Sequence, residues 1–218
     1  MILVVVSMIK NSDLFNLDGN ILSDLFNKCT YPYEILPIID DYILELGKRL
    51  SPSEYEKKND NVWIHKSVKI GSGVEIVGPA IIMEGVVLRH NAYLRENVII
   101  GPNSVVGNSC EIKNSILLSL CEVPHFNYVG DSILGTKVHL GAGVVLANLR
   151  LDKKNIRIQN NDTNLRKIGA FIGDNCQIGC NSVICPGTII LKDKIVYPLS
   201  VIKGIYDIID KETIVERL

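Results

Sequence analysis

The amino-acid sequence predicts an all-β solenoid built from short parallel strands. Two observations support this prediction. Aliphatic side chains recur at every sixth position from Val62 onward, and Gly, Asn, Ser and Pro gather in the second half of each six-residue block. A helix of 3.6 residues per turn cannot keep a period of six, whereas a short strand followed by a corner can. Three such units close a coil of about 18 residues, and stacked coils pair their strands along the axis.

The blocks follow one another from Val62 as VWIHKS, VKIGSG, VEIVGP, AIIMEG, VVLRHN, AYLREN, VIIGPN, SVVGNS, CEIKNS and ILLSLC. Every third position is aliphatic: Ile64, Ile70, Ile76, Ile82, Leu88, Leu94, Ile100, Val106, Ile112 and Leu118. The register resumes after Tyr128 with SILGTK, VHLGAG and VVLANL, and from Ala170 with AFIGDN, CQIGCN, SVICPG, TIILKD and KIVYPL. We expect the third-position side chains to form columns inside the coil.

Three segments depart from the repeat and set the expected domain boundaries. Residues 1–60 carry an apolar run and helically spaced apolar residues, so we expect a small N-terminal strand and helix cap. The β-helix should span residues 61–205, with an inserted loop at 150–169. Residues 206–218 are expected to form a short C-terminal helix.

Composition excludes several classes of function. The 218-residue chain has a net charge of −1, so the whole chain should not attract nucleic acid or an anionic membrane surface. The apolar run at the N-terminus has no basic leader and is too short to cross a membrane, which favours a cytoplasmic protein. The six cysteines form no CxxC pair and have no neighbouring histidine, so we expect reduced thiols and no zinc site.

The loop at 150–169 is distinctly basic. It contains Arg150, Lys153, Lys154, Arg157, Arg166 and Lys167 against only Asp152 and Asp162. Such a cluster in a near-neutral chain suggests an anionic ligand, although a solvated loop would look the same in isolation.

The stretch PHFNYVGDS, followed by GAG and ANLR, resembles a known enzyme family. It is similar to the acetyltransferase β-helix of the bifunctional glucosamine-1-phosphate acetyltransferase/N-acetylglucosamine-1-phosphate uridylyltransferases. It is closer still to the archaeal-type sugar-1-phosphate nucleotidylyltransferases that also acetylate. The resemblance covers roughly residues 62–205. Residues 1–60 show no Gly-rich phosphate loop, so we expect no nucleotidyltransferase domain in this chain.

The resemblance implies a left-handed coil, a homotrimer with sites between subunits, and acetyl-CoA as co-substrate. The implied reaction is N-acetylation of glucosamine-1-phosphate or galactosamine-1-phosphate, in the amino-sugar metabolism that supplies UDP-GlcNAc to the cell envelope. By position, His125 would be the catalytic base, and the backbone N–H of Ala142 would face the thioester carbonyl. Cys180, where the family has serine, would contact the coenzyme together with Ala142. The implied substrate-binding residues are Arg95, Lys113, Tyr128, His139, Asn148, Lys154 and Arg157.

Some positions depart from the family pattern. His139 stands where the family usually has asparagine, and Arg157 stands where a second lysine would be expected. Both histidine and asparagine can donate and accept a hydrogen bond, so the role at position 139 can survive the exchange. Lys167 is a further basic candidate, but the loop length differs there.

The implied chemistry suits these residue types. An amine attacks a thioester only when neutral, and histidine, with a reference pKa near ~6.5, can take its proton at neutral pH. A backbone N–H can stabilise the oxyanion, and no metal is required. Arg95 and Lys113 are 18 residues apart and should stack about 4.8 Å apart on adjacent coils, where they would repel unless an anion joins them. His125 should lie at a different corner, so a site that uses both needs a second protomer.

Two other readings remain open. His90 and His125 have a spacing similar to the ligands of γ-carbonic anhydrases, but Gly130 stands where that site needs another histidine. The chain could also be a binding or scaffolding solenoid without catalytic activity. Within the acyltransferases, the acceptor could carry a free phosphate or a nucleotide.

Overall fold

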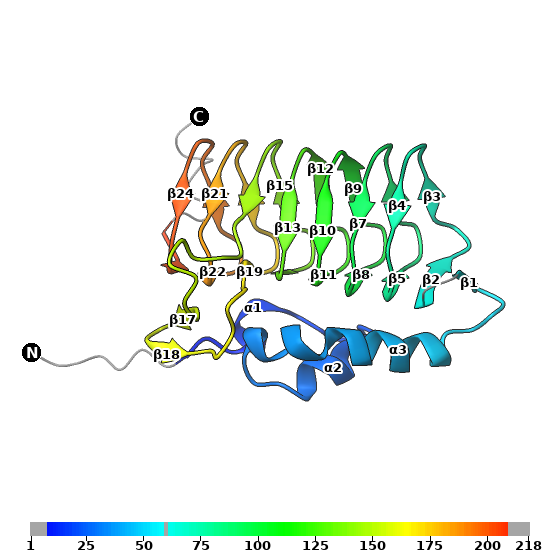
Figure 1. Cartoon of the computed structure of the whole chain (residues 1–218), viewed down its shortest axis with the longest axis horizontal. Coiled ribbons are helices and arrows are strands. Elements are labelled where there is room, and N and C mark those ends of the chain that lie inside the picture. The colour runs from blue at the N-terminus through cyan, green and yellow to red at the C-terminus, as the bar shows by residue number, and fades with distance from the viewer. Residues whose placement is uncertain (1–7, 59–60, 209–218) are drawn as a thin grey trace, which may run out of the picture.

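A computed structural model describes residues 8–58 and 61–208 and has the predicted architecture. Short parallel strands wind into a three-sided coil, with one sheet on each side (Figure 1). This is a parallel β-solenoid, and it is consistent with the left-handed form implied by the resemblance. The three sheets are called the first, second and third faces below, in the order in which the chain visits them.

The first face contains β1 (Tyr55–Lys58), β2 (Val62–His65), β5 (Ala80–Ile82), β8 (Val98–Ile100), β11 (Ser115–Leu117), β14 (Ile133–Leu134), β19 (Ala170–Ile172), β22 (Thr188–Ile190) and β25 (Ile205–Tyr206). The second face contains β3 (Lys69–Ile70), β6 (Val87–Leu88), β9 (Val105–Asn108), β12 (Glu122–His125), β15 (His139–Leu140), β20 (Gln177–Ile178) and β23 (Ile195–Val196). The third face contains β4 (Glu75–Ile76), β7 (Tyr93–Leu94), β10 (Glu111–Lys113), β13 (Tyr128–Gly130), β16 (Val145–Leu146), β21 (Val183–Ile184) and β24 (Val201–Ile202). All pairings within these faces are parallel except that of β1 with β2.

The interior of the coil is an aliphatic column, as the six-residue period predicts. Third-position side chains such as Leu88, Leu94 and Ile112 are buried there. Ile70 is 50% exposed, because it belongs to the first coil and no further coil covers that end. Burial of each such side chain contributes about 1.5–3 kcal/mol, so the column is the main source of stability.

The predicted register is wrong at Leu118. Leu117 occupies the interior column, and Leu118 packs in a second apolar cluster outside the first face. The cause is a five-residue unit that ends at Asn114. Ile81 pairs with Ile99, 18 residues on, whereas Ile99 pairs with Ile116, only 17 residues on.

A second five-residue unit ends at Asp131, since Ile116 pairs with Ile133, again 17 residues on. Asn114 and Asp131 have positive φ values of 44° and 49°, a conformation that Asn and Asp adopt more readily than most residues. These shortened units tighten the same corner, between the third and first faces, in two successive coils.

The N-terminal helices lie along the first face instead of covering an end of the coil (Figure 1). They are α1 (Asn11–Leu14), α2 (Ser23–Asn27) and α3 (Ile39–Arg49), with two 3-10 turns, η1 (Pro32–Glu34) and η2 (Leu36–Ile38). Their apolar residues pack against Ile81, Ile99 and Phe171 on the outer side of the strands. The first face is therefore buried on both sides, which explains apolar runs such as AII, VII and AFI.

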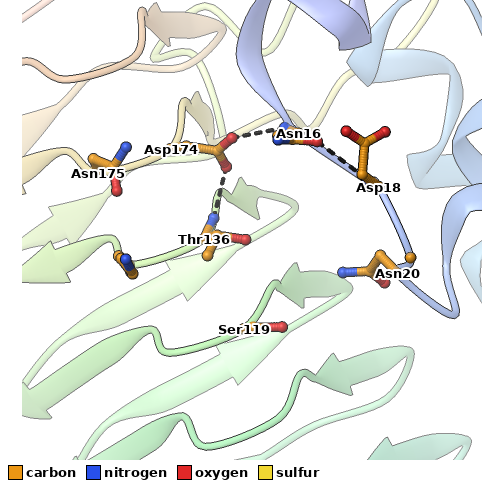
Figure 2. A pocket seen from close by; sticks show the side chains of 9 residues that line it. Asn16, Asp18, Asn20, Ser119, Thr136, Asp174 and Asn175 are labelled. Carbon is orange, nitrogen blue, oxygen red and sulfur yellow. Dashed lines mark hydrogen bonds between the residues drawn. The ribbon is translucent and has the colours of Figure 1, made fainter.

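Asp174 fastens the N-terminal segment to the coil. One carboxylate oxygen accepts the backbone N–H of Asn16 at 2.7 Å, and the other accepts that of Thr136 at 2.8 Å (Figure 2). Asp174 is only 5% exposed, and burial raises the pKa of its carboxyl group. It borders a polar pocket of about 360 Å³ between the two segments.

The remaining predicted segments differ in detail. The loop at 150–169 contains an antiparallel hairpin of β17 (Arg157–Ile158) and β18 (Asn161–Asp162), and Ile156, Ile158 and Ile168 anchor it in the outer apolar cluster. Tyr206, expected to begin a helix, ends strand β25. Most of the predicted N-terminal strand and C-terminal helix lies outside the described residues. No helix of residues 8–58 and 61–208 has the length and apolar character needed to cross a membrane.

Candidate active site

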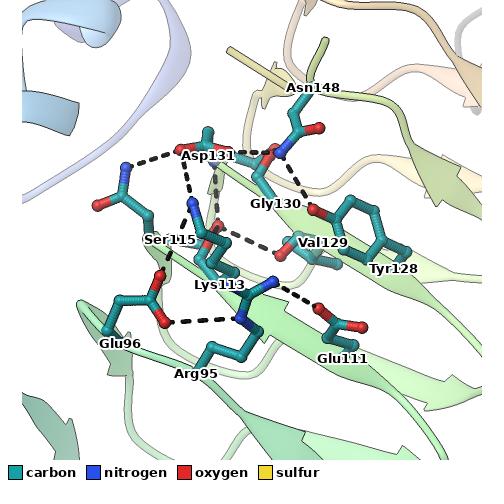
Figure 3. A network of polar contacts seen from close by, with 12 residues as sticks. Arg95, Glu96, Glu111, Lys113, Ser115, Tyr128, Val129, Gly130, Asp131 and Asn148 are labelled. Carbon is teal, nitrogen blue, oxygen red and sulfur yellow. Dashed lines mark hydrogen bonds and ion pairs between the residues drawn. The ribbon is translucent and has the colours of Figure 1, made fainter. Parts of the chain in front are cut away.

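A network of charged and polar side chains lies at the corner between the third and first faces (Figure 3). Tyr93 and Leu94 pair with Glu111 and Ile112, so Arg95 and Lys113 occupy equivalent positions on adjacent coils. This confirms the predicted stacking of these two cations. The shortened corner then brings Asp131 of the next coil alongside them.

Carboxylates of the chain itself separate the two cations. Arg95 lies 3.5 Å from Glu96 and 3.1 Å from Glu111. Lys113 lies 3.9 Å from Glu96 and 3.6 Å from Asp131. The expectation that Arg95 and Lys113 need an external anion between them is therefore wrong, since these carboxylates already relieve their repulsion.

Tyr128 and Asn148 complete this network. The Asn148 amide donates one hydrogen bond to the Tyr128 hydroxyl at 3.0 Å and another to the Asp131 carboxylate. Burial, more than the nearby carboxylates, raises the pKa of Tyr128, so its hydroxyl stays protonated at neutral pH. Because that oxygen accepts from Asn148, its own hydrogen remains available to a ligand oxygen.

A separate pocket of about 390 Å³ lies on the outer side of the second face. It brings together four residues predicted from the sequence. They are His125, His139, Ala142 and Cys180. Arg89, Val105, Glu122, Pro124 and Gly141 form the rest of its lining.

The backbone around His125 is fixed from the interior. Buried Asn127 accepts the His125 N–H at 3.0 Å and donates to the Gly141 carbonyl at 2.7 Å. Within the described residues no group hydrogen-bonds to the His125 imidazole, and none accepts from the Ala142 N–H. Both groups are therefore open to a ligand in this pocket, as a base and an oxyanion donor must be.

His139 differs from His125 because a carboxylate holds its ring. Its Nδ1 lies 2.8 Å from a Glu122 oxygen, and the two residues are direct neighbours on β15 and β12. Sequence reasoning selected His139 but missed Glu122. The usable signal is position, since Glu122 and His139 both point outward from adjacent coils once the 17-residue spacing is known.

Asp131 and Arg89 were also missed. Asp131 belongs to the PHFNYVGDS stretch, yet its contacts with Lys113, Asn114 and Asn148 depend on the shortened corner. Arg89 has a guanidinium group with no ion pair or hydrogen bond to any described residue, and nothing in its local sequence marks it.

The pocket and the network occupy opposite edges of the third face. His125 ends β12 just before the corner that leads to Tyr128, whereas Lys113 and Asn148 lie at the other end of that face. Lys154 and Arg157 are exposed on the basic loop, and no contact joins their side chains to either group in the described part of the chain. The loop is nevertheless rooted at the network, because Gly169 donates to the Asp131 carbonyl at 2.8 Å.

No three His, Cys, Asp or Glu side chains are grouped to hold a metal ion in residues 8–58 and 61–208. His90, the other histidine of the carbonic-anhydrase reading, borders a different hollow, together with Lys69, Ser72 and Arg89.

Residues 76–168 match the family model for the GMPPB C-terminal domain. A bifunctional sugar-1-phosphate nucleotidylyltransferase/acetyltransferase from Sulfurisphaera tokodaii is 38% identical over 96 residues, which cover 42% of this chain and 24% of the relative. The bifunctional protein GlmU from Methanococcus maripaludis is 41% identical over 80 residues, covering 35% of this chain and 20% of the relative. The chain thus spans about a quarter or less of the length of these curated relatives.

Among solved structures, PerB from Caulobacter crescentus, in complex with CoA and GDP-perosamine, matches 73% of this chain and 61% of its own. Its identity is 16% and its TM-score 0.30, which adds nothing to the fold already described. The sequence matches carry the relationship. They confirm that the central coils of this chain resemble the β-helix proteins of the sugar-1-phosphate nucleotidylyltransferase/acetyltransferase and GlmU type.

Proposed function

We propose that this chain is an acetyl-CoA-dependent N-acetyltransferase that acts on the amine of an amino-sugar 1-phosphate in the cytoplasm. The observation that carries the proposal is the pocket on the second face. His125, His139, Ala142 and Cys180 are far apart in the sequence but line that one pocket, and the Ala142 N–H and His125 imidazole are open to it. The relatives whose printed names include acetyltransferase support the choice of reaction.

His125 takes the proton of the attacking amine, and the Ala142 N–H stabilises the oxyanion that forms on the thioester carbonyl. The coenzyme lies against Ala142 and Cys180, so its thioester meets the amine beside His125. The carbon–nitrogen bond forms, the carbon–sulfur bond breaks, and the coenzyme thiol leaves.

The sugar phosphate is bound by Tyr128, Asn148 and the basic loop. Since Glu96, Glu111 and Asp131 already balance the charge of Arg95 and Lys113, Lys154 and Arg157 supply the net positive charge that phosphate requires. The protein is a homotrimer in this proposal, because the edge with His125 on one protomer and a basic loop on another then border one site.

The test is acetyl transfer by the purified protein, followed by release of free thiol, with glucosamine-1-phosphate, galactosamine-1-phosphate and a nucleotide-linked amino sugar as acceptors. His125→Ala should lower kcat by about 10²–10⁴-fold, the usual contribution of acid–base catalysis, and should leave acetyl-CoA affinity unchanged. Lys48→Gln, an exposed charge removal on α3, is the matched control and should behave as wild type.

Three results would contradict the proposal. One is the absence of thiol release with every acceptor although acetyl-CoA binds, which would favour the binding or scaffolding solenoid. Another is a His125→Ala variant with wild-type kcat. A monomer by light scattering at micromolar protein would reject the shared site.

A further inference from the structure

Glu122 and His139 form a carboxylate–imidazole pair on the wall of the pocket that also contains His125. The pair spans adjacent coils, with Glu122 Oε2 2.8 Å from His139 Nδ1. Both side chains are partly exposed, 60% for Glu122 and 37% for His139. Of the two histidines in the pocket, only His139 has an orienting partner in the described chain.

This contact fixes which ring nitrogen is free. A carboxylate can only accept a hydrogen bond, so Nδ1 of His139 must carry the hydrogen. In the neutral ring, Nε2 is then the unprotonated nitrogen and the one left to meet a ligand. A base held by a carboxylate in this way is the arrangement that proton-transferring histidines share.

The proposed reaction must remove two protons from the substrate nitrogen. An aliphatic amine with a pKa of about 8 is mostly an ammonium ion at neutral pH and cannot attack. One proton must leave before the carbon–nitrogen bond forms, and a second must leave as that bond forms. One of the two ends on the coenzyme thiol after the carbon–sulfur bond breaks, and the other goes to water.

We propose that His139, positioned by Glu122, takes the first proton from the substrate ammonium, and that His125 takes the second. This division rests on the proposed function and extends it. Glu122 is a positioning residue, because it acts through His139 and stabilises the imidazolium that forms. It also explains why position 139, where the resembling family usually has asparagine, can hold a histidine here.

Other charged groups that border this pair are Lys137 and Arg89. Lys137 shares a hollow with Glu122 and His139, and Arg89 and Cys180 line the pocket itself. Gln177 pairs with His139 from the following coil and is uncharged. Neither cation contacts Glu122 within ion-pair distance among the described residues, so the carboxylate is left to His139.

The experiment compares Glu122→Gln and His139→Asn with wild type between pH 6 and pH 9. At pH 6.5 both variants should lose about 10–100-fold in kcat/KM, and near pH 9, where the amine is already neutral, they should come within threefold of wild type. Glu75→Gln is the matched control, because Glu75 also points outward from a strand and has no partner among the described residues. It should follow wild type throughout.

An acceptor analogue separates this inference from the proposed function. An alkoxyamine in place of the sugar amine is unprotonated at neutral pH and needs only one base. With it, Glu122→Gln and His139→Asn should match wild type at pH 7, whereas His125→Ala should stay impaired. Equal losses with both acceptors at every pH, or variants that match wild type at pH 6.5, would overturn the inference and leave the proposed function standing. Wild-type protein inactive with all acceptors would reject both.

Discussion

The side-chain amide of Asn148 donates a 3.0 Å hydrogen bond to the hydroxyl of Tyr128 across adjacent coils. Gly130 makes room for it. A Cβ atom at Gly130 would lie 2.5 Å from the Tyr128 hydroxyl and 2.8 Å from the Asn148 nitrogen, closer than real contacts allow. The two polar side chains therefore occupy the space over the glycine, and the arrangement depends on its missing side chain.

Gly130→Ala should displace the Tyr128 ring and break this hydrogen bond. We expect a stability loss of about 0.5–1.5 kcal/mol, the usual contribution of one hydrogen bond, because the tyrosine can swing outward. The KM for the sugar phosphate should rise more than tenfold with the KM for acetyl-CoA unchanged. Tyr128→Phe is the companion variant, and a Gly130→Ala protein with wild-type kinetics would show that Tyr128 does not bind the substrate.

Lys113→Ala should destabilise the fold more than Arg95→Ala. The Lys113 side chain is 13% exposed and pairs with the Asp131 side chain, which is 5% exposed, so its removal leaves a buried carboxylate without its cation. We expect a loss of about 1–3 kcal/mol in the free energy of unfolding. Arg95 is 34% exposed, and its removal should cost about 0–1 kcal/mol. Urea unfolding of the two variants would measure the difference, and equal losses would contradict this account.

Phe171→Ala should cost about 3–5 kcal/mol in the free energy of unfolding, because the ring is fully buried in the cluster between the first face and the helices. Leu151→Ala is the control. Leu151 is fully exposed on the basic loop, and its truncation should change stability by less than about 0.5 kcal/mol. Thermal or urea unfolding of both variants tests whether the helices are an integral part of the fold.

Asp174 should make stability depend on pH in an unusual direction for an aspartate. Burial raises its pKa in the folded state above the ordinary value of 3.8, so the folded chain binds this proton more tightly than the unfolded chain does. Its contribution to stability is therefore fully present below pH 3.8 and is lost as the pH rises through the raised pKa.

Asp174→Asn isolates this effect. At pH 7 the variant should be less stable by about 1–3 kcal/mol, because an amide nitrogen cannot accept the N–H of Asn16 or Thr136. The advantage of wild type over the variant should then grow as the pH falls toward 3.8. Urea unfolding at several pH values would measure it, and a shrinking advantage would mean that the pKa is not raised.

The sequence predicts the coil well because its period follows from the geometry of stacking. Each interior position must be apolar, and each corner needs residues that turn, so Leu88, Leu94 and Ile112 could be placed from spacing alone. The shift at Leu117 and Leu118 could not, because both residues are equally apolar and each is buried on one side of the same strand. The helical spacing of residues 1–60 likewise indicates helices but not which face they cover.

The candidate site was predicted less evenly. The resemblance selects His125, Ala142, Tyr128 and Asn148, and the structure groups them at one pocket and one network. Charge was harder to predict. Arg95 and Lys113 look like free phosphate ligands in the sequence, because Glu96, Glu111 and Asp131 approach them only after the coils stack and the corner tightens.

The helices along the first face also restrict how this molecule can meet another copy of itself. A bare three-sided prism could associate through any of its sides, but here one side is already occupied by the chain's own N-terminal segment along nearly its whole length (Figure 1). Contacts made by coil strands in an assembly must therefore come from the other two sides or from the ends. The edge between those two sides carries His125, so closing a ring of subunits through them would bring that histidine toward a neighbour and turn the covered side outward to solvent.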